Sequence, residues 1–301
     1  MFDRDINREV FGMQACIVTA YHNFNQLNTL IGVLSKKFEI YVHIDKKAKS
    51  SWKQILKEKE HVHIYSKFNI NWGGSAHLKA IVWLMNEALS NENISYFHII
   101  SGDDWPIRSL EEIYSFFEDS NEISLLTTKM SDMTDEWYKT SAKWQKYYSF
   151  LDIFNYKDLK QKIFVKSFVK FQQLIGVNRF KQLEIEMAQG LVWGGIPRNA
   201  FEYCMKYIHD NPEFWEFMTY GHASEEFFFQ TILANNDIFE KQISNKNYRY
   251  MNWNKKNGSY PGILDMDDYE NIINGECFFA RKIDLDISGK LIDTISEKYA
   301  I

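Results

Sequence analysis

The stretch IISGDDWPI, at residues 99–107, changes abruptly from apolar to acidic. Two isoleucines lead into a serine and a glycine, the aspartates Asp103 and Asp104 follow, and a proline comes soon after. This order is typical of a buried strand that stops at a polar turn. The adjacent aspartates could hold a metal ion together or could have separate roles.

The same order of strand and polar turn recurs along the first 130 residues. Short runs rich in Ile, Val, Tyr and Phe predict strands, and segments with apolar residues at helical spacing lie between them. The alternation predicts an α/β fold with a mostly parallel, Rossmann-like sheet flanked by helices on both faces. We expect strands at 15–20, 39–44, 62–65, 96–100 and 123–127, and helices at about 24–36, 50–59, 76–90 and 110–119.

The second half of the chain is predicted to be rich in helices. A strand-like piece, GLVWGGI at 190–196, interrupts it, and residues 245–262 form a basic, aromatic stretch that is expected to be a loop. No linker or repeat is evident, so we expect one domain over residues 1–301. The expected helices are at about 156–175, 198–209, 224–235, 266–274 and 288–299.

Composition and charge narrow the range of partners. The 301 residues carry a formal net charge of -5, and this lack of basic excess argues against nucleic acid. Three widely spaced cysteines, Cys16, Cys204 and Cys277, suggest reduced thiols in a cytosolic protein. Without an apolar leader or a run of about 18 apolar residues, we expect a cytoplasmic protein, with peripheral contact at the inner face of the membrane left open.

Ligands of parallel sheets bind beyond the carboxyl ends of the strands. This rule selects His22 after the first strand, Asp45 after the second and the two aspartates after the fourth. A D-x-D motif places two carboxylates on one side of the chain, whereas adjacent aspartates diverge. One aspartate could orient a hydroxyl while the other caps the helix near Ser109, and a simple turn explains the pattern equally well. A metal site is the weakest reading.

Three other motifs could carry function, and each has an ordinary structural explanation. Trp72 precedes two glycines and could stack on a ligand or plug the core. Glu225 and Glu226 open a predicted helix, where the helix dipole favours acids, although one of them could be a general base. Arg249 and Lys282 lie among aromatic residues, where cation–π packing is usual, and they matter only if the ligand carries phosphates.

Seven strings, taken in order, resemble the Core-2/I-branching glycosyltransferases, glycosyltransferase family 14, which includes peptide O-xylosyltransferases. They run from about Cys16 to Ile292 and read AYHNF, YVHIDKK, NWGGSAHLKA, YFHIISGDDWPI, SEEFFFQTI, RYMNW and FFARKID. The resemblance implies a GT-A-like fold without D-x-D and an inverting, metal-independent transfer from a UDP-sugar, most often of GlcNAc or xylose. The Golgi anchor of animal members is missing, which suggests a bacterial-type relative.

The resemblance also implies roles for single residues. Glu226 matches the catalytic base of a P-D-E-like motif, with Ser and Glu replacing Pro and Asp. Asp45 matches an acid near the nucleoside, and Asp104 matches one near the donor and acceptor sugars. Arg249 and Lys282 match two cations that bind the diphosphate. Donor contacts are further expected from His22 and Trp72, and acceptor contacts from Trp193 and from Lys143, which stands where animal members have an arginine.

We therefore expect a nucleotide-binding half at about 14–130 and an acceptor-binding, catalytic half at about 131–301. The acceptor would be a glycan, a lipid-linked oligosaccharide or a protein, and no cofactor or metal is expected beside the UDP-sugar. The alternatives are a metal-dependent GT-A transferase and a carbohydrate-binding relative without catalysis. Burial and Glu225 should raise the pKa of Glu226 while a helix N-terminus lowers it, so we expect a pKa short of neutral.

Overall fold

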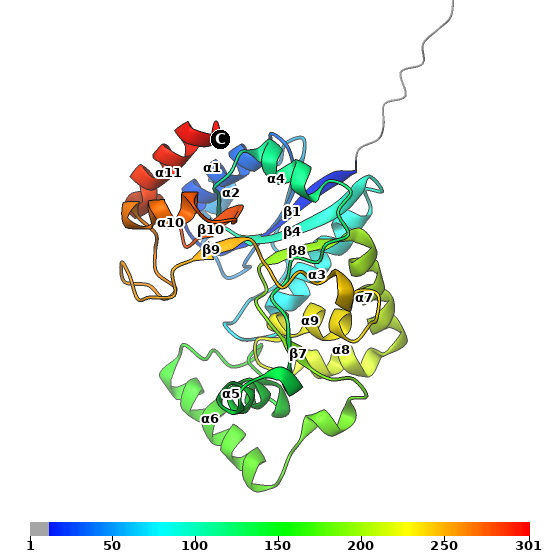
Figure 1. Cartoon of the computed structure of the whole chain (residues 1–301). Helices are drawn as coiled ribbons and strands as arrows, with labels where there is room; N and C mark the ends of the chain where they lie inside the picture. The colour runs from blue at the N-terminus through cyan, green and yellow to red at the C-terminus, as the bar shows by residue number, and fades with distance from the viewer. Residues whose placement is uncertain (1–11) are drawn as a thin grey trace, which may run out of the picture.

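The computed structural model describes residues 12–301, and a five-stranded sheet of order β3-β2-β1-β4-β8 lies at its centre (Figure 1). Strands β1 (Met13–Ala20), β2 (Glu39–Ile44), β3 (Val62–Tyr65) and β4 (Ile94–Ser101) pair in parallel. Strand β8 (Gly194–Pro197) runs antiparallel to β4 at the edge. The predicted α/β class with a mostly parallel sheet, as in GT-A-like folds, is confirmed.

The sheet is buried on both faces, and β1 shows why the middle of a strand, residues 15–18, is an unbroken apolar run. Ile17 packs into a cluster that contains residues of α3 (Ala76–Leu89). Its neighbour Val18 packs into a second cluster with residues of α1 (Phe24–Leu34). Because side chains alternate between the two faces of a strand, successive residues meet different layers of helices, and both sets are mostly apolar. The buried polar residues of β1, Gln14 and Thr19, make hydrogen bonds with Tyr114 and His77.

The helices of the first half lie close to their predicted positions. Helix α4 (Leu110–Phe117) begins after Ser109, whose hydroxyl accepts a hydrogen bond from the backbone N–H of Glu112. This N-cap hydrogen bond satisfies a free N–H of the first turn and so stabilises the start of the helix at this residue. Helix α2 (Trp52–Ile55) is a single turn, much shorter than the predicted 50–59, and none of its residues is buried.

The expected strand at 123–127 is wrong as a strand. Ile123 forms an isolated parallel bridge with Ile243, and Ser124 forms an antiparallel bridge with Gly195. Because consecutive residues pair with different segments, no ladder of hydrogen bonds builds up, although the residues are buried as a strand would be.

The second half is rich in helices, as predicted. Helix α5 (Asp135–Lys146), capped by the Thr134 hydroxyl, and α8 (Pro212–Thr219) were not predicted. The other elements are α6 (Leu159–Leu174), α7 (Arg198–Asp210), α9 (Phe228–Ala234), α10 (Tyr269–Ile273), α11 (Leu285–Tyr299), the strands β6 (Thr128–Lys129) and β7 (Ala188–Gln189), and the 3-10 turns η1 (Met130–Asp132), η2 (Arg179–Gln182), η3 (Ser224–Glu226), η4 (Glu240–Gln242) and η5 (Met266–Asp268).

A second, three-stranded sheet brings the end of the chain back to the turn after β4. Strand β10 (Phe279–Arg281) pairs antiparallel with β5 (Trp105–Pro106) and parallel with β9 (Arg249–Met251). The stretch 245–262, expected to be a loop, therefore contains a strand. The pairing places the FFARKID segment beside the two aspartates.

One buried side chain fixes this arrangement. The Gln26 amide, on α1, donates hydrogen bonds to the backbone carbonyls of Gly102 and Ile283, and its oxygen accepts one from the N–H of Leu285. A single residue thus joins α1, the turn after β4 and the start of α11. Within the part of the chain that the structure describes, no helix has the length and apolar character needed to cross a membrane.

Candidate functional site

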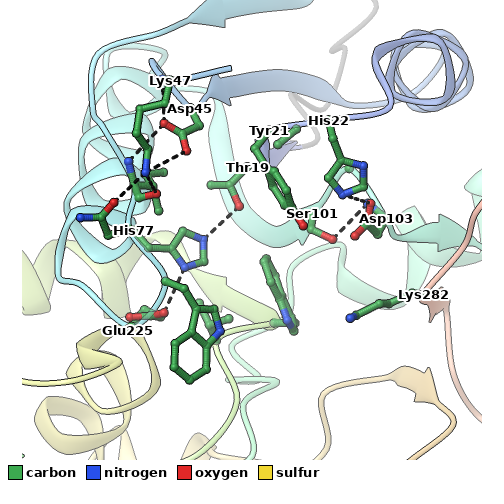
Figure 2. Close-up of a pocket in the computed structure, with 18 of the residues that line it drawn as sticks. Thr19, Tyr21, His22, Asp45, Lys47, His77, Ser101, Asp103, Glu225 and Lys282 are labelled. Atoms are coloured by element: carbon green, nitrogen blue, oxygen red, sulfur yellow. Dashed lines mark hydrogen bonds and ion pairs between the residues drawn. The ribbon is translucent and has the colours of Figure 1, made fainter. Parts of the chain in front are cut away.

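A cavity of about 440 Å³ lies at the carboxyl ends of β1, β2 and β4 (Figure 2). Thr19 and Ala20 end β1 at its wall, Asp45 follows β2, and Ser101 and Asp103 end β4 and begin its turn. Parallel strands that stop together leave their last side chains and the following turns around one space, which is the usual ligand site of such sheets.

His77, at the start of α3, connects the end of β1 with Glu225 in η3. Its Nε2 lies 3.0 Å from the Thr19 hydroxyl oxygen, and its Nδ1 lies 3.2 Å from Oε1 of Glu225 (Figure 2). The imidazole is therefore held between a strand and η3, and it fixes the direction of the Glu225 carboxylate. The other oxygen of Glu225 is buried and has no partner among the described residues.

The second acid of the pair, Glu226, also lines the cavity. Its Oε2 accepts a hydrogen bond of 3.3 Å from the Gln189 amide. Burial first, and then the neighbouring charge of Glu225, raise the pKa of Glu226 to about 8. The expected pKa short of neutral is wrong, because η3 is a three-residue turn and α9 begins only at Phe228, so no long helix dipole offsets the burial.

Asp103 faces the cavity and pairs with His22. Nε2 of His22 lies 3.5 Å from Oδ1 of Asp103, and this contact raises the pKa of the imidazole. Burial acts to raise the pKa of Asp103, but the hydrogen bond and charge of His22 and the charges of Arg281 and Lys282 lower it overall. Asp103 is therefore an ionised carboxylate at neutral pH, on the rim of the cavity.

The structure corrects the expected position of Asp104, which does not line the cavity. The side chain is fully buried, and its Oδ2 accepts hydrogen bonds from the backbone N–H and the hydroxyl of Ser101. Its Oδ1 lies 3.4 Å from Nε of Arg249, and its Oδ2 lies 3.6 Å from Nη1 of Arg281. Because the carboxylate points beneath the turn toward two guanidinium groups, it supports the site from below.

Arg249 also lies elsewhere than expected. Its guanidinium is buried, stacks 4.5 Å from the ring centre of Phe279, and donates a hydrogen bond of 2.9 Å to the carbonyl of Ile99. Arg249 pairs in register with Phe279, two residues before the end of β10, so it lies deeper in the sheet than the cavity wall. Arg249 is therefore not part of the cavity wall in this structure, and its expected contact with the diphosphate stays a prediction.

Arg281, which the sequence analysis missed, lines the cavity instead. Its guanidinium carbon lies 4.4 Å above the ring centre of Trp193, and its buried Nη1 makes no hydrogen bond with the described residues. Lys282 follows on the same wall, with Nζ 3.1 Å from the hydroxyl of Ser259. Burial first, and then the charge of Arg281, lower the pKa of Lys282. The adjacent basic pair in FFARKID was the available signal.

The two carboxylate oxygens of Asp45 differ: one accepts two hydrogen bonds, and the other has a single, more distant contact. Oδ1 accepts hydrogen bonds from the backbone N–H groups of Lys47 and Ile70, at 3.0 and 3.2 Å. Oδ2 has the Lys47 ammonium at 3.9 Å. The carboxylate therefore ties the end of β2 to the next loop and still offers an acceptor to the cavity.

Most of the expected site residues lie around this one cavity, and the rest are placed elsewhere. Lys143, on α5, is exposed and is not part of the wall, so its acceptor role stays a prediction. Residues 12–301 contain no group of three or more His, Cys, Asp or Glu side chains placed to hold a metal ion. The expected residues that line the cavity are His22, Asp45, Trp72, Trp193, Glu226 and Lys282.

Comparison with known proteins shows similarity over most of the chain. The family described as "Core-2/I-Branching enzyme" matches residues 16–273. A curated protein named "Xylosyltransferase", from Ciona intestinalis, is 22% identical over 328 residues, an alignment that covers 99% of this chain. The chain spans 35% of the length of that relative. The family match includes the acidic pair and most of the cavity wall, and it ends before Arg281 and Lys282.

Proposed function

The chain belongs to the Core-2/I-branching enzyme family, and on this premise we propose that it transfers a sugar from a UDP-sugar to an acceptor hydroxyl, with inversion at the anomeric carbon. One observation carries the proposal: the acids Glu225 and Glu226 share a cavity with the cations Arg281 and Lys282. We propose GlcNAc or xylose as the sugar, and the name of the Ciona relative supports xylose. The acceptor would be a glycan, a lipid-linked oligosaccharide or a protein.

Glu226 is the proposed general base. Its carboxylate takes the proton of the acceptor hydroxyl while the hydroxyl oxygen attacks the anomeric carbon from the side opposite UDP. The bond between that carbon and the UDP oxygen breaks in the same step, and UDP leaves with the bonding electrons. A pKa of about 8 makes Glu226 a stronger base than an ordinary carboxylate, which suits proton removal near neutral pH.

The departing UDP gathers negative charge on its diphosphate, and the proposed mechanism stabilises that charge with side chains. Arg281 lines the cavity with a guanidinium that is held in place by the ring of Trp193 and the carboxylate of Asp104. Lys282 adds a point charge beside it. Prepositioned cations in a partly buried site stabilise a leaving group more than mobile ones in water do.

The test is a mass-spectrometric screen of UDP-sugars for hydrolysis and for transfer to sugar acceptors, run with and without EDTA. We expect turnover of one donor, retained in EDTA and little changed by added Mg²⁺ or Mn²⁺. Arg281→Ala should lower turnover more than donor binding, because the leaving-group charge peaks in the transition state, whereas Lys290→Ala on the exposed surface of α11 serves as control. Loss of turnover in EDTA favours the metal-dependent alternative, and binding without turnover favours a carbohydrate-binding protein.

Asp45 is expected to bind the nucleoside through Oδ2. Asp45→Asn keeps an oxygen for the N–H groups of Lys47 and Ile70 but replaces the charged acceptor with an amide. We expect UDP binding, measured by calorimetry, to weaken by about 1–3 kcal/mol, the usual contribution of a hydrogen bond to a charged group. Unchanged UDP affinity in a variant of normal stability would leave Asp45 with only its structural role.

The acidic pair predicts a specific pH dependence. Only the ionised form of Glu226 accepts a proton, so kcat/KM should rise with pH through about 8, the pKa of that group in the free protein. Glu225→Gln removes one cause of the raised pKa and should shift the rise to lower pH. If Glu225→Gln abolishes turnover at every pH instead, Glu225 is the base.

A further inference from the structure

Helix α6 presents an apolar face that the rest of the described chain leaves uncovered. Its members are Leu159, Ile163, Phe164, Phe171 and Leu174, which are between 52% and 87% exposed. They recur at spacings of about three, four and seven residues and therefore lie on one side of the helix. We call these five residues the α6 face. Contiguous exposed apolar surface of this kind usually marks a binding surface.

The opposite side of α6 is firmly attached to the protein. Val165 and Gln172 are buried, and the Gln172 amide exchanges two hydrogen bonds of 2.9 Å with the backbone N–H and carbonyl of Tyr148. The helix lies on the outside of the molecule, at the end remote from α11 (Figure 1). The α6 face is thus presented to solvent by a helix whose orientation is fixed.

The charges on α6 are all positive. Lys160, Lys162, Lys166 and Lys170 lie on the helix, which contains no Asp or Glu and has only Asp158 at its N-cap. None of these lysines has a carboxylate within 4.0 Å among residues 12–301. Two copies of the chain packed through this helix would bring like charges together, which disfavours self-association. A basic helix with an exposed apolar face is typical of peptides that lie in the interface of an anionic membrane.

We propose that the α6 face docks on an anionic phospholipid membrane, with its apolar residues inserted at the headgroup boundary and its lysines against the lipid phosphates. This inference goes beyond the proposed transfer reaction and does not depend on it.

The loop that enters α6 also forms part of the cavity wall, through Asn155 and Lys157. Between them lies Tyr156, whose ring centre is 5.8 Å from that of Trp72, another wall residue. The proposed docking surface and the cavity therefore belong to one continuous segment. Docking would bring the cavity close to the membrane surface, where a membrane-bound acceptor is concentrated.

The experiment is co-sedimentation of the purified chain with vesicles of phosphatidylcholine alone or mixed with phosphatidylglycerol, without any nucleotide. We expect binding to the mixed vesicles that weakens as salt is added. Lys166→Gln with Lys170→Gln should lower the partition coefficient about fivefold for each lysine. Ile163→Gln with Leu174→Gln should lower it about tenfold or more. The matched control, Ile287→Gln with Lys290→Gln on α11, should bind as the unchanged chain does.

The possible results distinguish a membrane from a second copy of the chain as the partner of the α6 face. The substituted side chains are exposed, so circular dichroism should show an unchanged fold. Absence of vesicle binding, or binding that the α6 variants do not weaken, overturns the proposal. It is also overturned if light scattering shows a dimer that the Ile163→Gln, Leu174→Gln variant converts to a monomer, because the face would then join two copies. Since no nucleotide is present, failure here leaves the proposed transfer reaction untouched.

Discussion

Glu226→Gln is expected to lower turnover by roughly 10²–10⁴-fold, the usual contribution of a positioned general base. Glutamine keeps the shape of the side chain and can still accept the hydrogen bond from Gln189, so the wall of the cavity should not move. The substitution removes only the ability to accept the acceptor's proton. Binding of the UDP-sugar, measured by calorimetry, should therefore remain close to that of the unchanged chain.

Glu225→Gln is the matched control, since it is the same substitution one residue away on the same turn. It should retain turnover with a displaced pH profile, because its carboxylate is already bound to His77. Near-normal turnover by Glu226→Gln would remove Glu226 from the mechanism and make Glu225 the next candidate.

Asp104→Asn should lower the free energy of unfolding by about 3–5 kcal/mol, the usual effect of breaking a buried ion pair. The carboxylate is fully buried and lies within 3.4–3.6 Å of guanidinium nitrogens of Arg249 and Arg281. Asparagine preserves the volume but leaves two positive charges in the interior without a counter-charge. Urea denaturation measures the loss, and the cavity should lose its fixed position for Arg281 as well.

The adjacent aspartate supplies the control. Asp103→Asn removes an ion pair with the half-exposed His22, whose Nε2 lies 3.5 Å from the Asp103 carboxylate. Ion pairs near the surface contribute about 0–1 kcal/mol to the free energy of unfolding. If Asp104→Asn destabilises the fold no more than Asp103→Asn does, Asp104 does not hold the two arginines. The expected difference expresses the separate roles of the two aspartates: Asp103 faces the ligand space, and Asp104 supports the sheet beneath it.

The central sheet could be predicted because each of its strands is marked by the residues of that strand alone. In β1, β2 and β4, most residues pack into one of the two apolar clusters that cover the sheet, so the predominantly apolar sequence itself marks the strand. The ends of these strands then indicate where a ligand binds, which brought His22 and Asp45 into the prediction. Both line the cavity.

The small sheet could not be predicted in the same way. Strands β5, β9 and β10 have two or three residues each, too few to show a period, and they form only because distant segments pair. The register of that pairing decides which arginine reaches the cavity. Arg249 lies opposite Phe279 inside the sheet, whereas Arg281 lies at its end. The residues of RYMNW show no pattern from which this register could be predicted.

The acidic pair shows a similar limit. The sequence indicates two acids before a helix, which favoured a moderate pKa for Glu226. Only the structure shows that the helix proper starts later and that the carboxyl is largely enclosed. The balance between burial and dipole depends on three-dimensional surroundings that a string of letters does not specify.

The return of the FFARKID segment to the turn after β4 has a consequence for biosynthesis. During translation, the five strands of the large sheet and the acids Glu225 and Glu226 are synthesised before Arg281 and Lys282. Until β10 pairs with β5 and Gln26 joins the carbonyls of Gly102 and Ile283, the nascent chain has a nearly complete interior, but its cavity lacks Arg281 and Lys282 and has only Lys47 and Lys157 as lysines or arginines in its wall. Such contacts between distant parts of a chain form slowly. The emerging polypeptide should therefore acquire its shape first and its full affinity for an anionic ligand last.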